Sequence, residues 1–122
     1  MKLDVAGTSY EVKMGYKAVR KLNEFYKLEQ DVEEKGQEAT LKMSFGQNFL
    51  VMYLQQGDLE AVVNFFLAGL DYLNPGPSED LIIEAAEKFY LENDDAAEQC
   101  LKELDESGFF KKQLENMKMS NE

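Results

Sequence analysis

The most apolar stretch of the chain lies near its middle, where residues 58–73 read DLEAVVNFFLAGLDYL. Apolar side chains recur there at the three- and four-residue steps of an α-helix, and the resulting stripe consists of Leu59, Val62, Val63, Phe66, Leu67, Leu70 and Leu73. A second apolar set lies off this stripe and consists of Ala61, Phe65, Ala68 and Tyr72. A helix with two apolar faces is either central to its fold or holds one face for a partner.

The preceding stretch, from about Leu41 to Gln56, also reads as a helix with two apolar faces. One face carries Phe45, Phe49, Met52 and Tyr53, and the other carries Leu50, Val51 and Leu54. Gly57 separates the two helices, and Asp58 is placed to cap the first turn of the second. Because this helix pair carries surplus apolar surface, we expect its most buried side chains to include Phe49, Met52, Phe66 and Leu70.

Three further helices and a hairpin complete the expected fold. The helices run from about Gly15 to Glu29, from an N-cap at Ser78, and from a cap at Asp94 or Asp95 to Gly108. At the N-terminus, apolar and polar residues alternate on both sides of the turn at 6–8; the apolar ones are Leu3, Val5, Tyr10, Val12 and Met14. The sequence therefore predicts a single, mainly α domain over 1–122, with a short β-hairpin at 1–14, a bundle of about five helices at 15–118 and a frayed tail at 119–122.

The composition argues against an enzyme. The chain has no histidine, so Ser-His-Asp and Cys-His nucleophile pairs are excluded, together with the commonest zinc ligand. Its one cysteine, Cys100, has helical spacing with Ala97 and Leu104 and reads as a small core residue. No Gly-rich phosphate loop is present. We therefore assign no catalytic, cofactor-binding or metal-binding residue. No signal peptide or membrane span is expected, which favours a cytoplasmic protein.

The acidic charge is concentrated in one part of the chain. The formal net charge is −11, and residues 1–42 contribute nothing to it because their acidic and basic residues balance. Such a chain would be repelled by phosphate backbones, so we expect no nucleic-acid binding. Solvated helix surfaces explain most of the acidic residues, which alternate with core positions. An acidic decoy, such as a DNA-mimic inhibitor, and another kind of small helical adaptor remain as alternatives.

The order of these elements resembles a known family. The sharpest segment is GYKAVRKLN at residues 15–23, followed by the helix break at Gln56, Gly57 and Asp58 and the helix start PGPSED at 75–80. From Leu3 to about Leu114, the chain resembles the tail assembly chaperones of siphophages and prophages of Gram-positive bacteria. The resemblance implies a small, helical, non-enzymatic protein of the bacterial host cytoplasm that is absent from the mature virion.

The resemblance also implies partners. Such chaperones hold the long tape measure protein soluble until the major tail protein polymerises around it, and a longer frameshifted product would add a contact with the major tail protein. Self-association remains open. An apolar groove and a strongly charged remainder suit this work. As partner-binding candidates we take Phe65 and Tyr72 from the off-stripe face, together with Phe109 and Phe110 near the end. The alternative is that all four complete the core of the bundle.

Two consecutive lysines, Lys111 and Lys112, bear on the frameshifted product. Their codons could form an A-rich slippery sequence, whereas the simpler interpretation is that cations end a helix and complement its dipole. The nucleotide sequence decides between the two.

Overall fold

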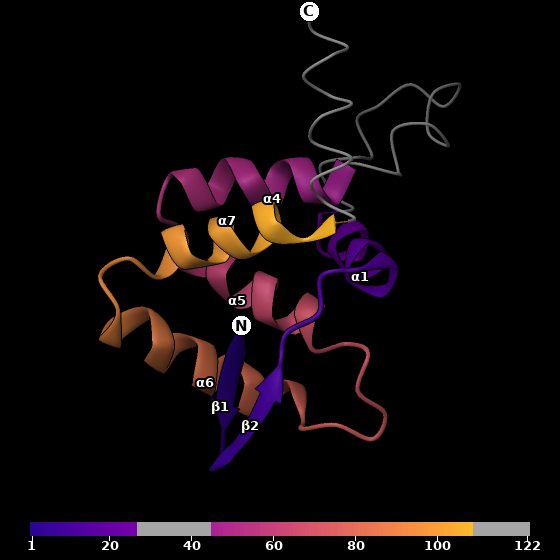
Figure 1. The fold of residues 1–122 in the computed structure, drawn as a ribbon, viewed down its shortest axis with the longest axis vertical. Helices are drawn as coiled ribbons and strands as arrows, with labels where there is room; N and C mark the ends of the chain where they lie inside the picture. The colour runs from indigo at the N-terminus through magenta and orange to yellow at the C-terminus, as the bar shows by residue number, and fades with distance from the viewer. Residues whose placement is uncertain (27–44, 109–122) are drawn as a thin grey trace, which may run out of the picture.

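The computed structural model describes residues 1–26 and 45–108. Its elements are β1 (Lys2–Val5), β2 (Thr8–Glu11), α1 (Tyr16–Phe25), α4 (Phe45–Gln55), α5 (Leu59–Gly69), α6 (Glu79–Glu92) and α7 (Ala96–Glu106). Figure 1 shows α4 and α7 side by side, α5 beneath them, and α6 with the hairpin at the opposite end of the molecule. The predicted fold class, mainly α with an N-terminal β-hairpin, is confirmed. The expected tail at 119–122 and the end of the expected bundle lie outside the described residues.

The hairpin forms as the alternation predicts. Its strands pair antiparallel, with Lys2 opposite Glu11 and Val5 opposite Thr8, and the two turn residues, Ala6 and Gly7, have φ values of 51° and 89°. Positive φ at both central residues is the geometry of the type I′ turn that fits twisted strands. One face of the hairpin is buried against the helices through Leu3, Val5, Val12 and Met14.

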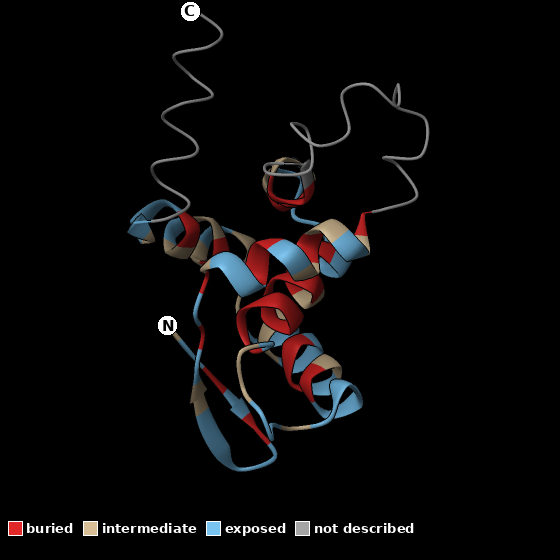
Figure 2. Ribbon diagram, turned by 90° about the vertical axis from the view of Figure 1, so that its right-hand side faces the viewer, coloured by how far each residue is buried: buried red, intermediate tan, exposed pale blue. Residues whose placement is uncertain are grey.

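Helix α5 is the centre of the fold. Figure 2 shows it buried along most of its length, and its buried residues are Ala61, Val62, Asn64, Phe65, Phe66, Leu67, Ala68 and Gly69. It packs against α1, α4, α6 and α7. The chain that follows the hairpin contacts Gly69, the last residue of α5. The Lys13 N–H donates to the Gly69 carbonyl at 2.9 Å, and a Cβ at Gly69 would lie 2.4 Å from Cγ1 of Val12. The sequence left open whether this helix is central to the fold or holds one apolar face for a partner, and the structure shows that it is central.

Helix boundaries follow the predicted caps, with small corrections. The Asp58 carboxylate accepts from the Ala61 N–H at 3.1 Å, and the Ser78 hydroxyl accepts from the Leu81 N–H at 3.3 Å. Asp95 is the N-cap of α7, but its side chain accepts instead from the Gln99 amide at 2.8 Å. Helix α5 ends at Gly69 instead of Leu73, where the chain turns away against the hairpin.

Two other boundaries concern α1 and α4. Helix α1 has Gly15 as its N-cap and Tyr26 as its C-cap. The rest of the helix expected up to Glu29 lies outside the described residues, as do positions 41–44 of the helix expected to begin at Leu41.

The expected core was right for α5 and partly wrong for α4. Phe66 and Leu70 are 0% and 2% exposed, as predicted. The predicted burial of Met52 is wrong, because its side chain is 40% exposed, and Phe49 is only partly buried. The reason is the rotation of α4, which turns the face of Leu50 and Leu54 into the core and the face of Phe49 towards the end of α1. Both faces are apolar, so periodicity alone could not choose between them.

A buried glutamine interrupts the core face of α4. Gln47 is fully buried, and within the part of the chain that the structure describes neither its Nε2 nor its Oε1 has a hydrogen-bond partner. A buried amide without partners costs free energy, because it loses its hydrogen bonds to water and gains none in return.

The first prediction concerns Phe66, which packs edge-to-face on Phe65 and on Phe89 with ring centroids 5.1 Å apart in each case. We expect Phe66→Ala to lower the free energy of unfolding by about 3–5 kcal/mol, because it leaves a cavity at the centre of the fold. Chemical denaturation measures the change. Met52→Ala on the exposed face of α4 is the control, and an equal loss for both variants would contradict the packing described here.

The second prediction concerns Gln47. We expect Gln47→Met, which keeps the size of the side chain and removes its polar atoms, to raise the free energy of unfolding by about 1–2 kcal/mol. Gln55→Met, on the exposed side of the same helix, should change it little. Thermal and chemical unfolding check both. A destabilised Gln47→Met variant would mean that the amide has a partner in solution.

Candidate functional site

The predicted partner-binding residue Phe65 does not lie on the surface. Its side chain is 0% exposed and its ring meets that of Phe66 at 85°. The premise that Phe65 lies off the core is therefore wrong, and the reason is that neighbours pack around α5 on more than its main stripe. Phe65 and Tyr72 consequently do not form the exposed aromatic pair that their spacing predicted.

Tyr72 lies at the junction between the end of α5 and the hairpin. It is partly buried, its hydroxyl donates to the Glu11 carbonyl at 2.8 Å, and Lys13 Nζ lies 4.8 Å from its ring centroid. These contacts give Tyr72 a structural role in holding the hairpin. Whether it also contacts a partner stays a prediction. Phe109 and Phe110, together with Lys111 and Lys112, lie outside the described residues.

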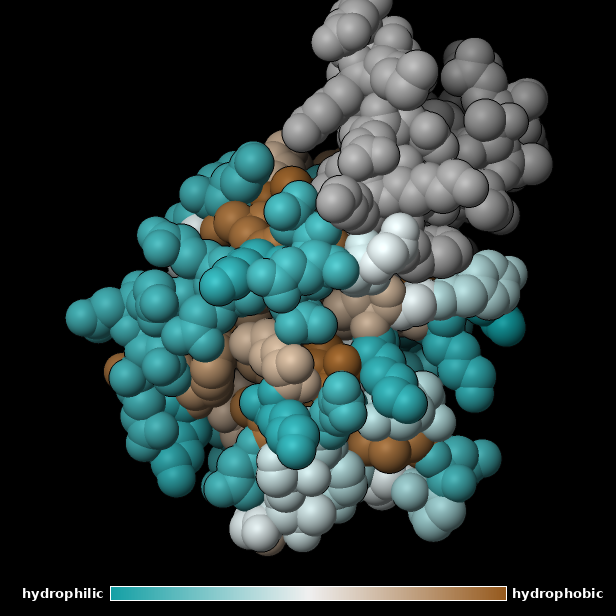
Figure 3. Space-filling view, in the orientation of Figure 1, coloured by the Kyte–Doolittle hydropathy of each residue, from teal (hydrophilic) through white to brown (hydrophobic). Residues whose placement is uncertain are grey.

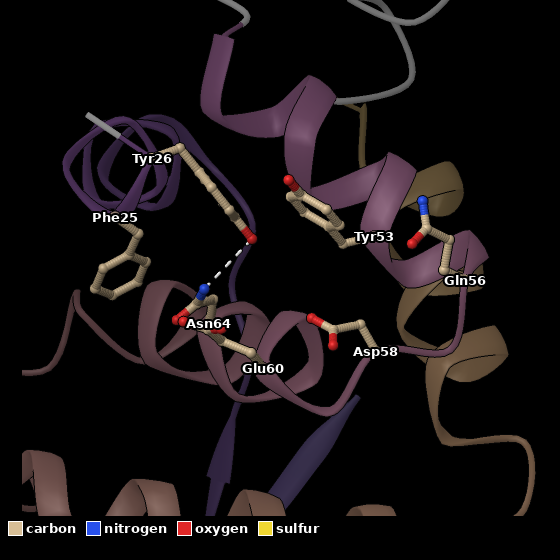
Figure 4. Close-up of a pocket in the computed structure, with 7 residues that line it drawn as sticks. All are labelled: Phe25, Tyr26, Tyr53, Gln56, Asp58, Glu60 and Asn64. Atoms are coloured by element: carbon tan, nitrogen blue, oxygen red, sulfur yellow. Dashed lines mark hydrogen bonds between the residues drawn. The ribbon is translucent and has the colours of Figure 1, made fainter. Parts of the chain in front are cut away.

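A groove of about 500 Å³ lies where the ends of α1 and α4 meet the beginning of α5 (Figure 4). Of the predicted binding residues that the structure describes, neither Phe65 nor Tyr72 lines it. Two of its lining residues are the last residue and the C-cap of α1, two come from α4 and the turn after it, and three from the N-cap and first turns of α5. They are Phe25, Tyr26, Tyr53, Gln56, Asp58, Glu60 and Asn64. This groove is the candidate functional site.

The wall of the groove is aromatic. The lining residues Tyr26 and Tyr53 form a cluster with Phe49, in which each pair of rings is inclined by 23°, with centroids 5.8–6.1 Å apart. Such offset stacking is favourable beyond the area that it buries and holds the rings in place. Figure 4 shows Tyr26 and Tyr53 next to each other, with Phe25 on the other side of Tyr26. The wall therefore offers a pre-formed apolar surface from two helices.

A glycine contact brings these two helices together. A Cβ on Gly46 would lie 2.5 Å from the backbone carbon of Leu22, so the backbones of α4 and α1 touch at this point. The Gly46 N–H also donates to the Asn23 side-chain oxygen at 2.7 Å. This contact sets how far apart the aromatic residues of α1 and α4 lie, and any larger residue at position 46 would push the helices apart.

The floor and rim of the groove are polar. Asn64, only 9% exposed, donates from Nδ2 to the hydroxyl of Tyr26 at 3.3 Å, which links α5 to the aromatic wall. Asp58 and Glu60 lie at the rim and are exposed. The turn between α4 and α5 is held from α6, because the Tyr90 hydroxyl donates to the Gly57 carbonyl at 2.8 Å. An aromatic wall with an acidic rim is suited to binding a side chain of a peptide or protein.

Other chemistry has little support in the described part of the chain. Among residues 1–26 and 45–108 there is no group of three or more His, Cys, Asp or Glu residues that could hold a metal ion. Cys100 is fully buried, as predicted, and burial raises the pKa of its thiol far above the ordinary value, with a smaller contribution from the charge of Glu103. No helix described here is both long and apolar enough to cross a membrane.

The sequence contains one signal for the groove. Phe49 and Tyr53 are four residues apart on one face of a helix, and the break at 55–58 brings the start of the next helix close to them. Helix-helix corners of this kind place side chains from two elements at one point, so a groove could have been expected there. The sequence could not predict that Phe25 and Tyr26 line the groove, because this depends on which helices pack together.

Comparisons with known proteins identify the family. Neither the curated proteins nor the solved structures include a match to the chain. A protein-family model described as "Phage tail assembly chaperone protein, TAC" matches residues 2–118. This match covers nearly the whole sequence and agrees with the resemblance noted from residues 15–23 and from the helix order. The chain belongs to the phage tail assembly chaperone family.

Proposed function

We propose that the protein binds a segment of the phage tape measure protein and keeps it soluble during tail assembly. Family membership supports a role in tail assembly. The observation that carries the binding step is the groove between α1, α4 and α5, whose aromatic wall is held in place by stacking and by the Gly46 contact. In this proposal the protein works by binding alone, without catalysis.

The charge of the rest of the molecule supports the solubilising part of the proposal. A tape measure segment with apolar side chains would aggregate unless its carrier stays dispersed. The carrier has a formal net charge of −11, and Figure 3 shows hydrophilic side chains over most of the described surface on the face viewed, with hydrophobic ones in small separate patches. Mutual repulsion between such complexes keeps them apart.

The proposal also places the protein in the assembly sequence. It would act in the cytoplasm of the bacterial host, release the tape measure protein as the major tail protein polymerises, and be absent from the finished virion. A longer frameshifted product would contact the major tail protein. These steps extend the resemblance to tail assembly chaperones, and each is part of the proposal.

The prediction that tests this function uses Phe25, a partly buried groove residue on α1. Co-expression with the tape measure protein of the same phage should keep that protein in the soluble fraction. We expect Phe25→Ala to weaken binding by about 1–2 kcal/mol, because aromatic residues carry much of the energy of interfaces. Co-purification and the affinity of the purified pair measure the effect, and circular dichroism shows whether the variant is folded.

The matched control is Tyr16→Ala. Tyr16 lies on the same helix and is 59% exposed, but it does not line the groove. If the two substitutions weakened binding equally, the groove would not be the binding surface. If the folded wild-type protein neither co-purifies with the tape measure protein nor raises its solubility, the proposed function itself is wrong.

A further inference from the structure

The rim of the groove carries two carboxylates, those of Asp58 and Glu60. Asp58 and Glu60 are exposed, and neither takes part in an ion pair with any residue that the structure describes. No lysine or arginine is among the described residues that line the groove. Asp58 uses Oδ2 to cap α5, which leaves its other oxygen able to accept a further hydrogen bond. The groove therefore combines negative charge with aromatic rings.

Among residues 1–26 and 45–108, neighbouring charges do not cancel this negative charge. The C-terminal end of α4 and the N-terminal end of α5 meet at the turn over 56–58, so the negative end of one helix dipole offsets the positive end of the other. Lys21 contacts a groove residue, since its Nζ lies 5.5 Å from the ring centroid of Phe25, but it also lies 3.6 Å from the Glu24 carboxylate. Of the charged residues described around the groove, Lys21 pairs with Glu24, and Asp58 and Glu60 keep their negative charge unpaired.

Aromatic rings next to carboxylates favour one kind of side chain. The faces of tyrosine and phenylalanine attract a cation, and Arg and Lys also bring an aliphatic stem that packs on the rings. An arginine or lysine whose stem lies along Phe25 and Tyr53 would carry its charge towards Asp58 and Glu60. An apolar side chain alone would use the wall of the groove and leave the rim unused.

We infer that the groove binds a basic amphipathic helix, with a lysine or arginine placed between the aromatic wall and the carboxylates of Asp58 and Glu60. This inference rests on the proposed function and specifies which segment of the tape measure protein is bound. Coiled-coil-forming segments have the required pattern, because charged residues flank their apolar seam. The helix places an apolar residue in the groove and a cation one turn away at the rim.

The test uses Asp58→Asn together with Glu60→Gln, which removes two charges and keeps the shape and the helix cap, since asparagine also caps. Overlapping synthetic peptides from the tape measure protein are titrated against wild type and variant at low and high salt. We expect the tightest peptides to be basic, and the double variant to bind them roughly 10-fold more weakly at low salt. Replacing the critical Lys or Arg of the peptide by Gln should cause a similar loss, and little further loss with the variant.

Glu84→Gln with Glu87→Gln is the matched control. It removes the same charge from α6, none of whose residues lines the groove, and should leave peptide affinity within about twofold at moderate salt. If the peptides bind but the Asp58 and Glu60 variant binds as wild type does, the inference is overturned while the proposed function stands. Equal losses in both double variants would also overturn it, because they would show an effect of net charge alone. If no peptide and no full-length tape measure protein binds, the proposed function fails with it.

Discussion

The fold depends on the burial of α5 over most of its length, from Ala61 to Gly69. Its two phenylalanines, Phe65 and Phe66, are both 0% exposed. Phe66 packs edge-to-face on Phe89 of α6, and the ring of Phe65 packs nearly perpendicular to that of Phe66. An apolar helix of eleven residues cannot remain in water, so α1, α4, α6 and α7 must all close around it. The chain at the end of the hairpin covers the end of α5, because the Lys13 N–H donates to the Gly69 carbonyl and Val12 packs against the Cα of Gly69. Isolated hairpins are marginally stable and need such a support, which α6 provides at β1 and the end of α5 provides at Val12 and Lys13.

The same constraint explains where a binding surface can lie. With α5 buried from Ala61 onward except at Val63, the exposed part is its beginning at residues 58–60, and the ends of α1 and α4 are brought to that place. The aromatic residues of α1 and α4 then stack on each other beside an acidic helix start. A rigid groove of this kind loses little conformational entropy when it binds, which favours affinity for a helical partner. The assembly role of the family and the geometry of the groove therefore support the same proposal from separate observations.

The sequence allowed the elements to be predicted better than their contacts. The caps at Asp58 and Ser78, the hairpin alternation and the burial of Cys100 were readable because each depends on neighbours in sequence. Met52 and Phe65 were misassigned for a common reason: α4 and α5 each have two apolar faces, and periodicity does not show which one meets another helix. The groove was not predicted because it needs residues from α1 that are far from α4 and α5 in the chain. Gln47 was equally unreadable, since a polar residue on a core face breaks the pattern used to find the core.

We propose that the groove between α1, α4 and α5 is the surface that receives the tape measure protein. Amide chemical shifts of the isotope-labelled protein, followed by NMR as a tape measure fragment is added, test it without any substitution. We predict that the largest changes fall at the end of α1, at the end of α4 and in the first turns of α5, including Phe25, Tyr53, Glu60 and Asn64. Changes confined to α6 and the hairpin, with the groove residues unaffected at saturation, would contradict this claim.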